Sequence, residues 1–345
     1  MQSDNDILSN EELKQKALVA LRRRPLTNRY LGRAAQRRLS CHKWLESNLI
    51  QALIEDNEPL LGRAEDLLKH IYLGEPDLLE ELTASLTGGE KDFDAQFGDL
   101  WAELRAAKQL IYEGAENLSK IPRTNVLTPD FEYRYKDRPY LAEVKNLRSP
   151  TSLQELLDIK LRAIALLQPG IFEGVRLHFD LHAGEFGETW GYPDAKTECD
   201  AFVDKIYKAV IGGIRREVHV LHEVRRLSQR VHLSVKLQRS RSHSVIFTLG
   251  PQGYCLSDSE RAHVLVDPLE RKISSVVNTA FSQLNTFRTS EEIEGRIMLN
   301  WQKPAVFEWD ESLQRRVRAI VQDLADRFAG YDSNISVCLI SDPSG

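Results

Sequence analysis

The chain has 345 residues, of which 42% are hydrophobic and 28% charged, and its formal net charge is −5. This composition is typical of globular proteins, and the length is sufficient for one elaborated domain or for two domains. No apolar run approaches the ~20 residues that a membrane helix needs, and the first residues lack the basic and apolar regions of a signal peptide, so we expect no membrane partner and a cytoplasmic location.

The first basic region spans residues 13–43, where ten Lys or Arg occur without any Asp or Glu. Arg29, Arg33 and Arg37 recur every fourth residue and would form a row of guanidinium groups along one face of a helix. Each guanidinium can bind phosphate oxygens, so this row predicts contact with a nucleic-acid backbone despite the negative net charge. The alternative is a solvated helix that pairs with the acidic segment of residues 44–100.

Residues 1–89 are predicted to be helical, and Thr87–Lys91 has the composition of a linker. After it, apolar residues recur at helical spacing over residues 93–111. Glu103 falls on the flank of this apolar stripe, where it would lean toward the edge of a sheet. The alternative is an ordinary solvated glutamate.

A β-hairpin is predicted next, after a short strand somewhere within residues 116–123. Asp130 begins a run in which aromatic and charged residues alternate, and a turn near residues 136–138 leads into a second strand. Glu143 and Lys145 are two residues apart on that strand, so they share one face. The hairpin would bring Asp130 beside Glu143.

These residue types suit the hydrolysis of a phosphodiester bond. Hydrolysis requires charge neutralisation at the phosphate and an activated water, and a hard divalent ion held by one or two carboxylates supplies both. Asp130 and Glu143 would hold Mg²⁺ or Mn²⁺, with the carbonyl of Val144 completing the metal site. Lys145 would orient or help deprotonate the water.

Pro129-Asp130 and Glu143-Val144-Lys145 resemble, in this order, the two halves of the motif of the PD-(D/E)XK superfamily of restriction-endonuclease-like nucleases. The resemblance covers residues 92–181. It implies a metal-dependent nuclease with an αβββαβ core around a mixed sheet, in which Glu103 would be the acidic residue of the preceding helix. An exposed hairpin without catalytic function is the alternative.

The resemblance also predicts the rest of the core. A helix begins at the capping box Ser152–Glu155, and Val175–His182 alternates as a half-buried strand. Together they would close a core of residues 92–184. If the residues after 184 are instead an insertion, the helix Leu269–Phe287 and the strand Arg296–Trp301 would take these two places.

A second basic region spans residues 215–243, and a hairpin is predicted from residues 231–237 and 245–249. It could line a nucleic-acid groove, or it could be a sheet edge protected by charge. The candidate nucleic-acid contacts in this region are Arg225, Arg226, Arg239 and Arg241.

The predicted organisation is a helical region of residues 1–89, followed by an α/β domain of residues 90–345. Residues 185–345 would extend the core, either by continuing its sheet or as a separate domain. The predicted function is a nuclease, with DNA as substrate in preference to RNA and a homodimer as one way to cut both strands. The alternative is a non-catalytic nucleic-acid or protein interaction module on the same fold, in a defence or repair assembly.

Other classes of protein find no support in the motifs. The four cysteines are scattered without a Cys-x-x-Cys pair, so neither a disulfide framework nor a zinc ribbon is indicated. The chain has no Gly-x-x-x-x-Gly-Lys-Ser/Thr, Gly-x-Gly-x-x-Gly or Gly-x-Ser-x-Gly motif. An ATPase, a dinucleotide-dependent enzyme and a serine hydrolase are therefore not indicated.

Overall fold

The computed structural model describes residues 8–86, 93–122, 128–147, 160, 163–164, 166–168, 175–183, 203, 220–226, 231–239, 247–249, 258–290, 292–301 and 311–340. For residues 175–183, 220–226, 231–239, 247–249, 258–269, 311–314 and 316 it describes the backbone alone. The chain divides into two compact units. One comprises residues 18–44, 48–148 and 267–345, and the other comprises residues 1–17, 45–47 and 149–266.

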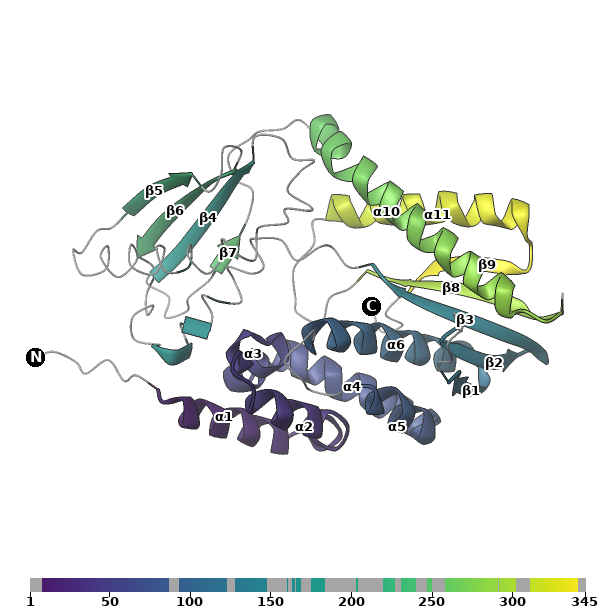
Figure 1. Ribbon diagram of the computed structural model, residues 1–345, viewed down its shortest axis with the longest axis horizontal. Coiled ribbons are helices and arrows are strands. Elements are labelled where there is room, and N and C mark those ends of the chain that lie inside the picture. Colours follow the sequence, from purple (N-terminus) through teal and green to yellow (C-terminus); the bar gives the residue numbers. More distant parts are fainter. Residues whose placement is uncertain are drawn as a thin grey trace, which may run out of the picture. The chain divides into compact units, whose positions relative to one another are not determined.

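A five-stranded mixed sheet forms the centre of the first unit (Figure 1). In spatial order its strands are β1 (Glu116–Lys120), β2 (Phe131–Tyr135), β3 (Arg138–Asn146), β8 (Glu294–Asn300) and β9 (Ile335–Leu339). The first three strands are antiparallel neighbours, whereas β3, β8 and β9 run parallel. The predicted mixed α/β class is therefore confirmed.

Helices cover both faces of this sheet (Figure 1). Helix α6 (Phe93–Glu113) lies on one face and contacts β1, β3 and β8. The part of α10 (Asp258–Phe287) after residue 266 lies on the other face together with α11 (Glu311–Tyr331). Coverage on both faces explains why the middle of β8 is fully buried, since a parallel strand between two helical layers is apolar on both sides. The fully buried residues of β8 are Ile297, Met298, Leu299 and Asn300.

A two-residue turn joins β2 to β3. Lys136 and Asp137 both have positive φ angles, 50° and 61°. Such a turn matches the right-handed twist of the strands and fixes their register. Phe131 is paired with Ala142 and Tyr135 with Arg138, so the predicted hairpin is confirmed, with a turn that ends before residue 138.

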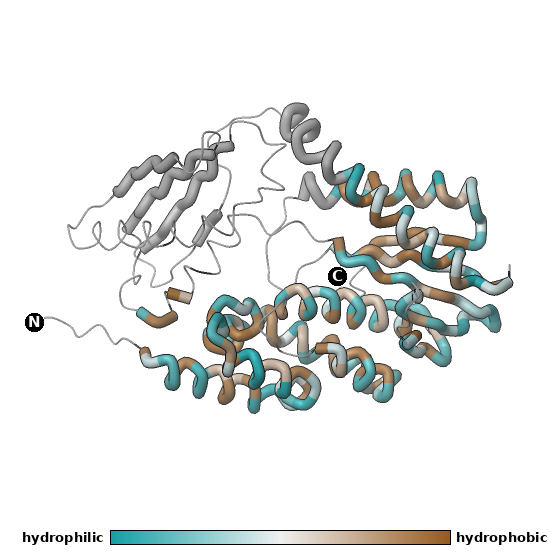
Figure 2. The backbone as a smooth tube through the Cα atoms, in the orientation of Figure 1, coloured by the Kyte–Doolittle hydropathy of each residue, from teal (hydrophilic) through white to brown (hydrophobic). Residues whose placement is uncertain are grey.

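Upstream of α6 the described chain is helical, as predicted. The elements are α1 (Asn10–Arg22), α2 (Pro25–Leu39), the 3₁₀ turn Trp44–Glu46, α3 (Asn48–Glu55), α4 (Glu58–Gly74) and α5 (Pro76–Ala84). Helices α4 and α5 contact α6, and Figure 2 shows apolar residues recurring among hydrophilic ones along these helices. The predicted linker Thr87–Lys91 lies outside the described residues.

The start of α2 depends on a residue that is distant in the sequence. Pro25 occupies the first turn, and the carboxylate of Glu65 on α4 accepts hydrogen bonds from the backbone N–H groups of Leu26 at 2.9 Å and Thr27 at 2.8 Å. The first N–H groups of a helix have no partner within the helix and attract negative charge. Glu65 therefore supplies the cap that the residues before Pro25 do not.

The second unit contains a separate four-stranded sheet. In spatial order its strands are β5 (Val220–Arg226), β6 (Val231–Arg239), β4 (Val175–Ala183) and β7 (Phe247–Leu249). Strand β6 is antiparallel to β5 and β4, and β7 is parallel to β4. The predicted hairpin of residues 231–237 with 245–249 is therefore wrong, because β7 pairs with β4 and not with β6.

The prediction that Val175–His182 closes the core sheet is also wrong. This segment is a strand, but it belongs to the second sheet, and the place beside β3 is taken by β8. The alternative from the sequence, in which Leu269–Phe287 and Arg296–Trp301 supply the next helix and strand, is the one observed. Most of the predicted helix that follows Ser152–Glu155 lies outside the described residues.

Candidate active site

Asp130 lies directly before β2 and is hydrogen-bonded to β3. Its backbone N–H donates to the carbonyl of Ala142 at 3.0 Å, and its Oδ2 accepts a hydrogen bond from the N–H of Val144 at 2.8 Å. Asp130 therefore contacts both residues that flank Glu143. In an extended strand the N–H and C=O of one residue point toward the same neighbouring strand, so the Val144 carbonyl is directed to the side on which Asp130 lies.

Glu143 and Lys145 form an ion pair on one face of β3. The Lys145 Nζ donates to Oε1 of Glu143. The Glu143 side chain is only 2% exposed, whereas that of Lys145 is 26% exposed. Burying an unpaired carboxylate is costly, so the ammonium group compensates for the burial of Glu143.

Gln283, which no sequence motif marks, connects the parts of this site. Its Nε2 donates to Oε2 of Glu143 at 3.0 Å and to the carbonyl of Thr128 at 2.5 Å, and its Oε1 lies 3.4 Å from the Lys145 Nζ. Gln283 is buried on α10, next to an apolar stripe. A glutamine beside such a stripe is common on any helix, so only its tertiary contacts distinguish it. The buried stripe consists of Ile273, Val277, Ala280 and Leu284.

Glu103 is buried on α6 and pairs with a lysine of β1. Its Oε2 lies 2.6 Å from Nζ of Lys120. The side chain of Asn146 points toward α6, because it donates a hydrogen bond to Asp99 of that helix at 3.4 Å. Successive side chains of a strand point to opposite faces, so Glu143, three residues before Asn146, points to the other face of the sheet. Glu103 is therefore not the solvated glutamate of the alternative, and a role for it in catalysis stays a prediction.

A buried polar network fixes the end of β3 on the α6 face. The side chains of Asn146 and Asn300 are hydrogen-bonded at 3.0 Å, at paired positions of β3 and β8. Arg105 of α6 donates to Oδ1 of Asn300 at 2.5 Å and to the carbonyl of Ile340 at 3.5 Å. Because Asn146 directly follows Lys145, this network and Gln283 constrain the same strand end from opposite faces.

The predicted arginine row on α2 is divided by its surroundings. Arg29 pairs with Glu80 at 2.9 Å, and its guanidinium packs over the rings of Tyr30 and Tyr72 at 5.0 and 5.5 Å. Arg33 and Arg37 are exposed to solvent, as is Arg29.

The arginines of the second basic region are less completely described. Arg225 on β5 and Arg226 beside it are described by the backbone alone, as is Arg239 on β6. Arg241 lies outside the described residues. Contacts of these side chains with nucleic acid stay predictions.

The donor set of the Asp130 site fits a hard divalent cation. Mg²⁺ and Mn²⁺ prefer oxygen ligands, and it is common for one or two carboxylates to hold them together with other oxygen donors. Asp130, Glu143 and the carbonyl of Val144 supply oxygen donors on adjoining segments. Among the residues that the structure describes, no three His, Cys, Asp or Glu side chains form a group that could hold a metal ion, so this set contains two carboxylates at most.

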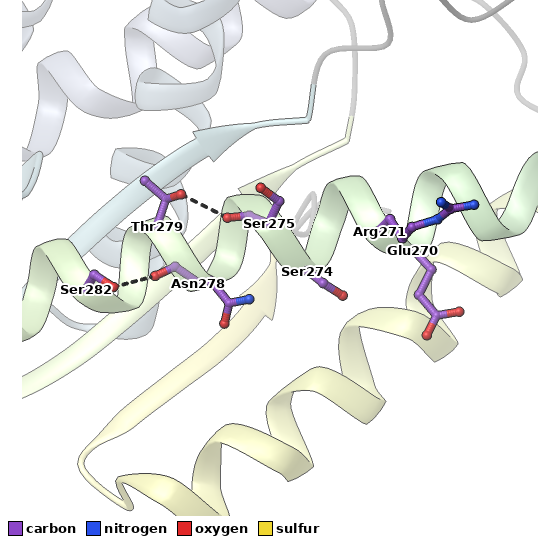
Figure 3. Close-up of a pocket in the computed structure, with 7 residues that line it drawn as sticks. All are labelled: Glu270, Arg271, Ser274, Ser275, Asn278, Thr279 and Ser282. Carbon is purple, nitrogen blue, oxygen red and sulfur yellow. Dashed lines mark hydrogen bonds between the residues drawn. The ribbon is translucent and has the colours of Figure 1, made fainter. Parts of the chain in front are cut away.

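A surface hollow lies along the outer side of α10 (Figure 3). The hydroxyl of Thr279 donates to the Ser275 carbonyl at 2.9 Å, and that of Ser282 donates to the Asn278 carbonyl at 3.0 Å. The predicted catalytic residues are not among the described residues that line it. The lining residues are Glu270, Arg271, Ser274, Ser275, Asn278, Thr279 and Ser282.

A second charged cluster lies on the α6 side of the sheet. Arg296 of β8 forms an ion pair with Glu113, at the end of α6, and its Nε lies 3.3 Å from the sulfur of Cys338. Burial pushes the pKa of Glu113 up, but hydrogen bonds from Arg296 and Gln109 outweigh this effect and hold the pKa below its ordinary value of 4.5. The cluster therefore stabilises the ionised form of Glu113.

The chain has no recognised relatives in the comparisons with known proteins. No protein-family model matches its sequence, and neither the curated proteins nor the solved structures contain a match. In the described part of the chain, no helix is both long enough and apolar enough to cross a membrane. A functional assignment therefore depends on the side-chain contacts of the chain itself.

Proposed function

We propose that the protein is a Mg²⁺- or Mn²⁺-dependent nuclease of the PD-(D/E)XK type that hydrolyses phosphodiester bonds in DNA. The observation that carries this proposal is that Asp130 and Lys145 both contact the short segment of β3 that contains Glu143. Asp130 is hydrogen-bonded to both neighbours of Glu143, and Lys145 is ion-paired with Glu143 itself. Two carboxylates and an ammonium group beside one strand end suit metal-assisted hydrolysis.

The order of the elements supports the same assignment. Along the chain, α6, β1, β2, β3, α10 and β8 follow one another in the order helix, three strands, helix, strand, if the second sheet is treated as an insertion. This is the αβββαβ order that the sequence resemblance implies. This order of elements is one reason for the proposal, with the second helix and the last strand supplied by a later part of the chain than first expected.

Each residue of the site has a distinct role in this proposal. Asp130, Glu143 and the Val144 carbonyl would hold the divalent ion, which neutralises charge on the phosphate and activates a water when bound. Lys145 would orient that water or accept its proton. Gln283 would hold Glu143 and Lys145 at a fixed separation.

The partners of the enzyme belong to the same proposal. DNA is proposed as substrate in preference to RNA, with Arg33 and Arg37 as exposed contacts for phosphate groups. The protein would act in the cytoplasm, and a homodimer would allow both strands of a duplex to be cut. A catalytic contribution from Glu103 would require that it act from the α6 side of the sheet.

Cleavage assays with matched variants test the proposal. The full chain is incubated with Mg²⁺ or Mn²⁺ and circular DNA, linear DNA or RNA, beside Asp130→Asn, Glu143→Gln and Lys145→Met. We expect the three variants to lose cleavage by at least 100-fold, a loss typical for the removal of one essential group. Glu132→Gln is the control, because Glu132 is an exposed carboxylate on the adjoining strand β2.

Two results would contradict the nuclease assignment. Equal cleavage by the wild-type protein and the three site variants would show that the activity comes from elsewhere. Binding of nucleic acid without cleavage under any of the metal conditions would instead favour an interaction module on the same fold.

A further inference from the structure

We propose that Lys145 is the resident counter-ion of Glu143 and limits how tightly the site binds a divalent cation. The ammonium group would have to leave the Glu143 carboxylate before a cation could be held there. This inference rests on the proposed function, because it concerns the ion that the nuclease would use. Lys145 would then have two roles: it would act on the water during hydrolysis, and it would compete with the cation for Glu143.

The contacts of the Glu143 carboxylate are the first evidence. Its Oε1 accepts from the Nζ of Lys145, and its Oε2 accepts from the Nε2 of Gln283 at 3.0 Å. Both oxygens that would ligate a cation are therefore already bonded to N–H donors. Of these two donors only Lys145 carries a positive charge, so it satisfies the electrostatic requirement that a metal ion would otherwise satisfy.

Burial makes this competition strong. Glu143 is 2% exposed, so little water is available to screen charges at its carboxylate. The energy between two charges at ion-pair separation grows as the effective dielectric constant falls, and it doubles when one of them is divalent. An ammonium group and a divalent cation on the same buried carboxylate would repel each other strongly. The affinity for the cation should therefore include the cost of moving Lys145 away.

The surroundings of Lys145 allow that movement. Its Nζ lies 3.4 Å from Oε1 of Gln283, a neutral acceptor that could keep the ammonium near the site. The Lys145 side chain is 26% exposed. The pair of Glu103 and Lys120 is more enclosed on its basic side, since the Lys120 side chain is only 13% exposed. Lys145 is therefore more exposed than Lys120 and has more room to move away from its carboxylate partner.

Cation binding without nucleic acid tests the proposal. The affinity of the full chain for Mn²⁺ is measured by calorimetry and by electron paramagnetic resonance. Lys145→Met should bind Mn²⁺ roughly tenfold more tightly than wild type, or about 1.4 kcal/mol. Lys145→Gln is a second neutral variant, whose amide can still donate to Glu143 if Lys145→Met does not fold. Lys145→Arg keeps the charge and should remain close to wild type.

Two further variants make the outcomes separable. Lys69→Met removes an exposed lysine of α4 and matches the change in net charge; it should bind Mn²⁺ like wild type. Glu143→Gln should abolish the binding. If Lys145→Met and Lys145→Gln bind no more tightly than wild type, while Glu143→Gln still loses binding, the counter-ion role is refuted and the metal site survives. If no Mn²⁺ binding depends on Glu143, the proposed function is refuted together with it.

Discussion

Replacing Gln283 by methionine would remove the polar atoms of this buried side chain while nearly keeping its length. Glu143 would lose the donor at Oε2, and the carbonyl of Thr128 would lose the donor at 2.5 Å. A hydrogen bond to a charged group contributes ~1.5–3 kcal/mol, and a buried carbonyl left without a partner costs ~1–3 kcal/mol. We expect Gln283→Met to lower the free energy of unfolding by about 3 kcal/mol.

The assay must report on the sheet that contains the site, because the chain has two compact units and unfolding of a protein with more than one unit is often not a single transition. Amide hydrogen exchange of β3 and α10, followed by mass spectrometry under native conditions, measures local opening there. Urea unfolding of the full chain gives the accompanying change in midpoint. If the protein is a nuclease, Gln283→Met should also cut more slowly, because Glu143 and Lys145 would no longer be held together.

Gln322→Met is the matched control. Gln322 is an exposed glutamine of α11 whose amide donates to Asp326 at 2.9 Å. Substitutions at such positions usually change stability by no more than ~0.5 kcal/mol. If Gln283→Met is as stable as Gln322→Met and exchanges its β3 amides at the wild-type rate, the contacts of Gln283 do not support the site.

Two other predictions concern stability away from the site. Glu113→Gln should cost about 1–2 kcal/mol at pH 7 by removing the charged partner of Arg296. Since the pKa of Glu113 is lowered in the folded protein, its contribution is present above the unfolded pKa and is lost as the pH falls through the folded pKa. The difference between wild type and variant in urea unfolding should therefore shrink below about pH 4.5, and a constant difference down to pH 3 would contradict the ionic origin. Asp137→Gly should stabilise the hairpin by about 0.5–1 kcal/mol, because glycine adopts a positive φ without strain. Asp137→Val should destabilise it by about 1–2 kcal/mol, and equal melting temperatures of these two variants would contradict the turn geometry.

The parts of the protein that the sequence predicts well are those that depend on near neighbours. The alternation of residues over Phe131–Tyr135 and the turn after it predict the β2–β3 hairpin. Once the hairpin forms, Asp130 approaches Glu143 over a short chain separation, and Lys145 shares the face of Glu143. These relations follow from the geometry of two adjacent strands, so they need no knowledge of the rest of the fold.

The strand order shows where local patterns are insufficient. Val175–His182 and Arg296–Trp301 both have the pattern of a strand, and the sequence left open which of them lies next to β3. The observed choice has a physical explanation. A parallel strand covered by helices on both faces must be apolar on both, as the run Ile297–Leu299 is, whereas the alternation of Val175–His182 suits a sheet with one polar face.

Only the tertiary structure determines which residues that are far apart in the sequence come into contact. Gln283 reaches Glu143 only because α10 packs on that face of the sheet, and Glu103 meets Lys120 because α6 packs on the other. Arg29 likewise has a guanidinium group that can bind phosphate, as the sequence suggested, but in the folded chain this group pairs with Glu80 of α5. Local periodicity determines which face a residue occupies, whereas the residue it meets there depends on how the buried faces of distant segments pack together.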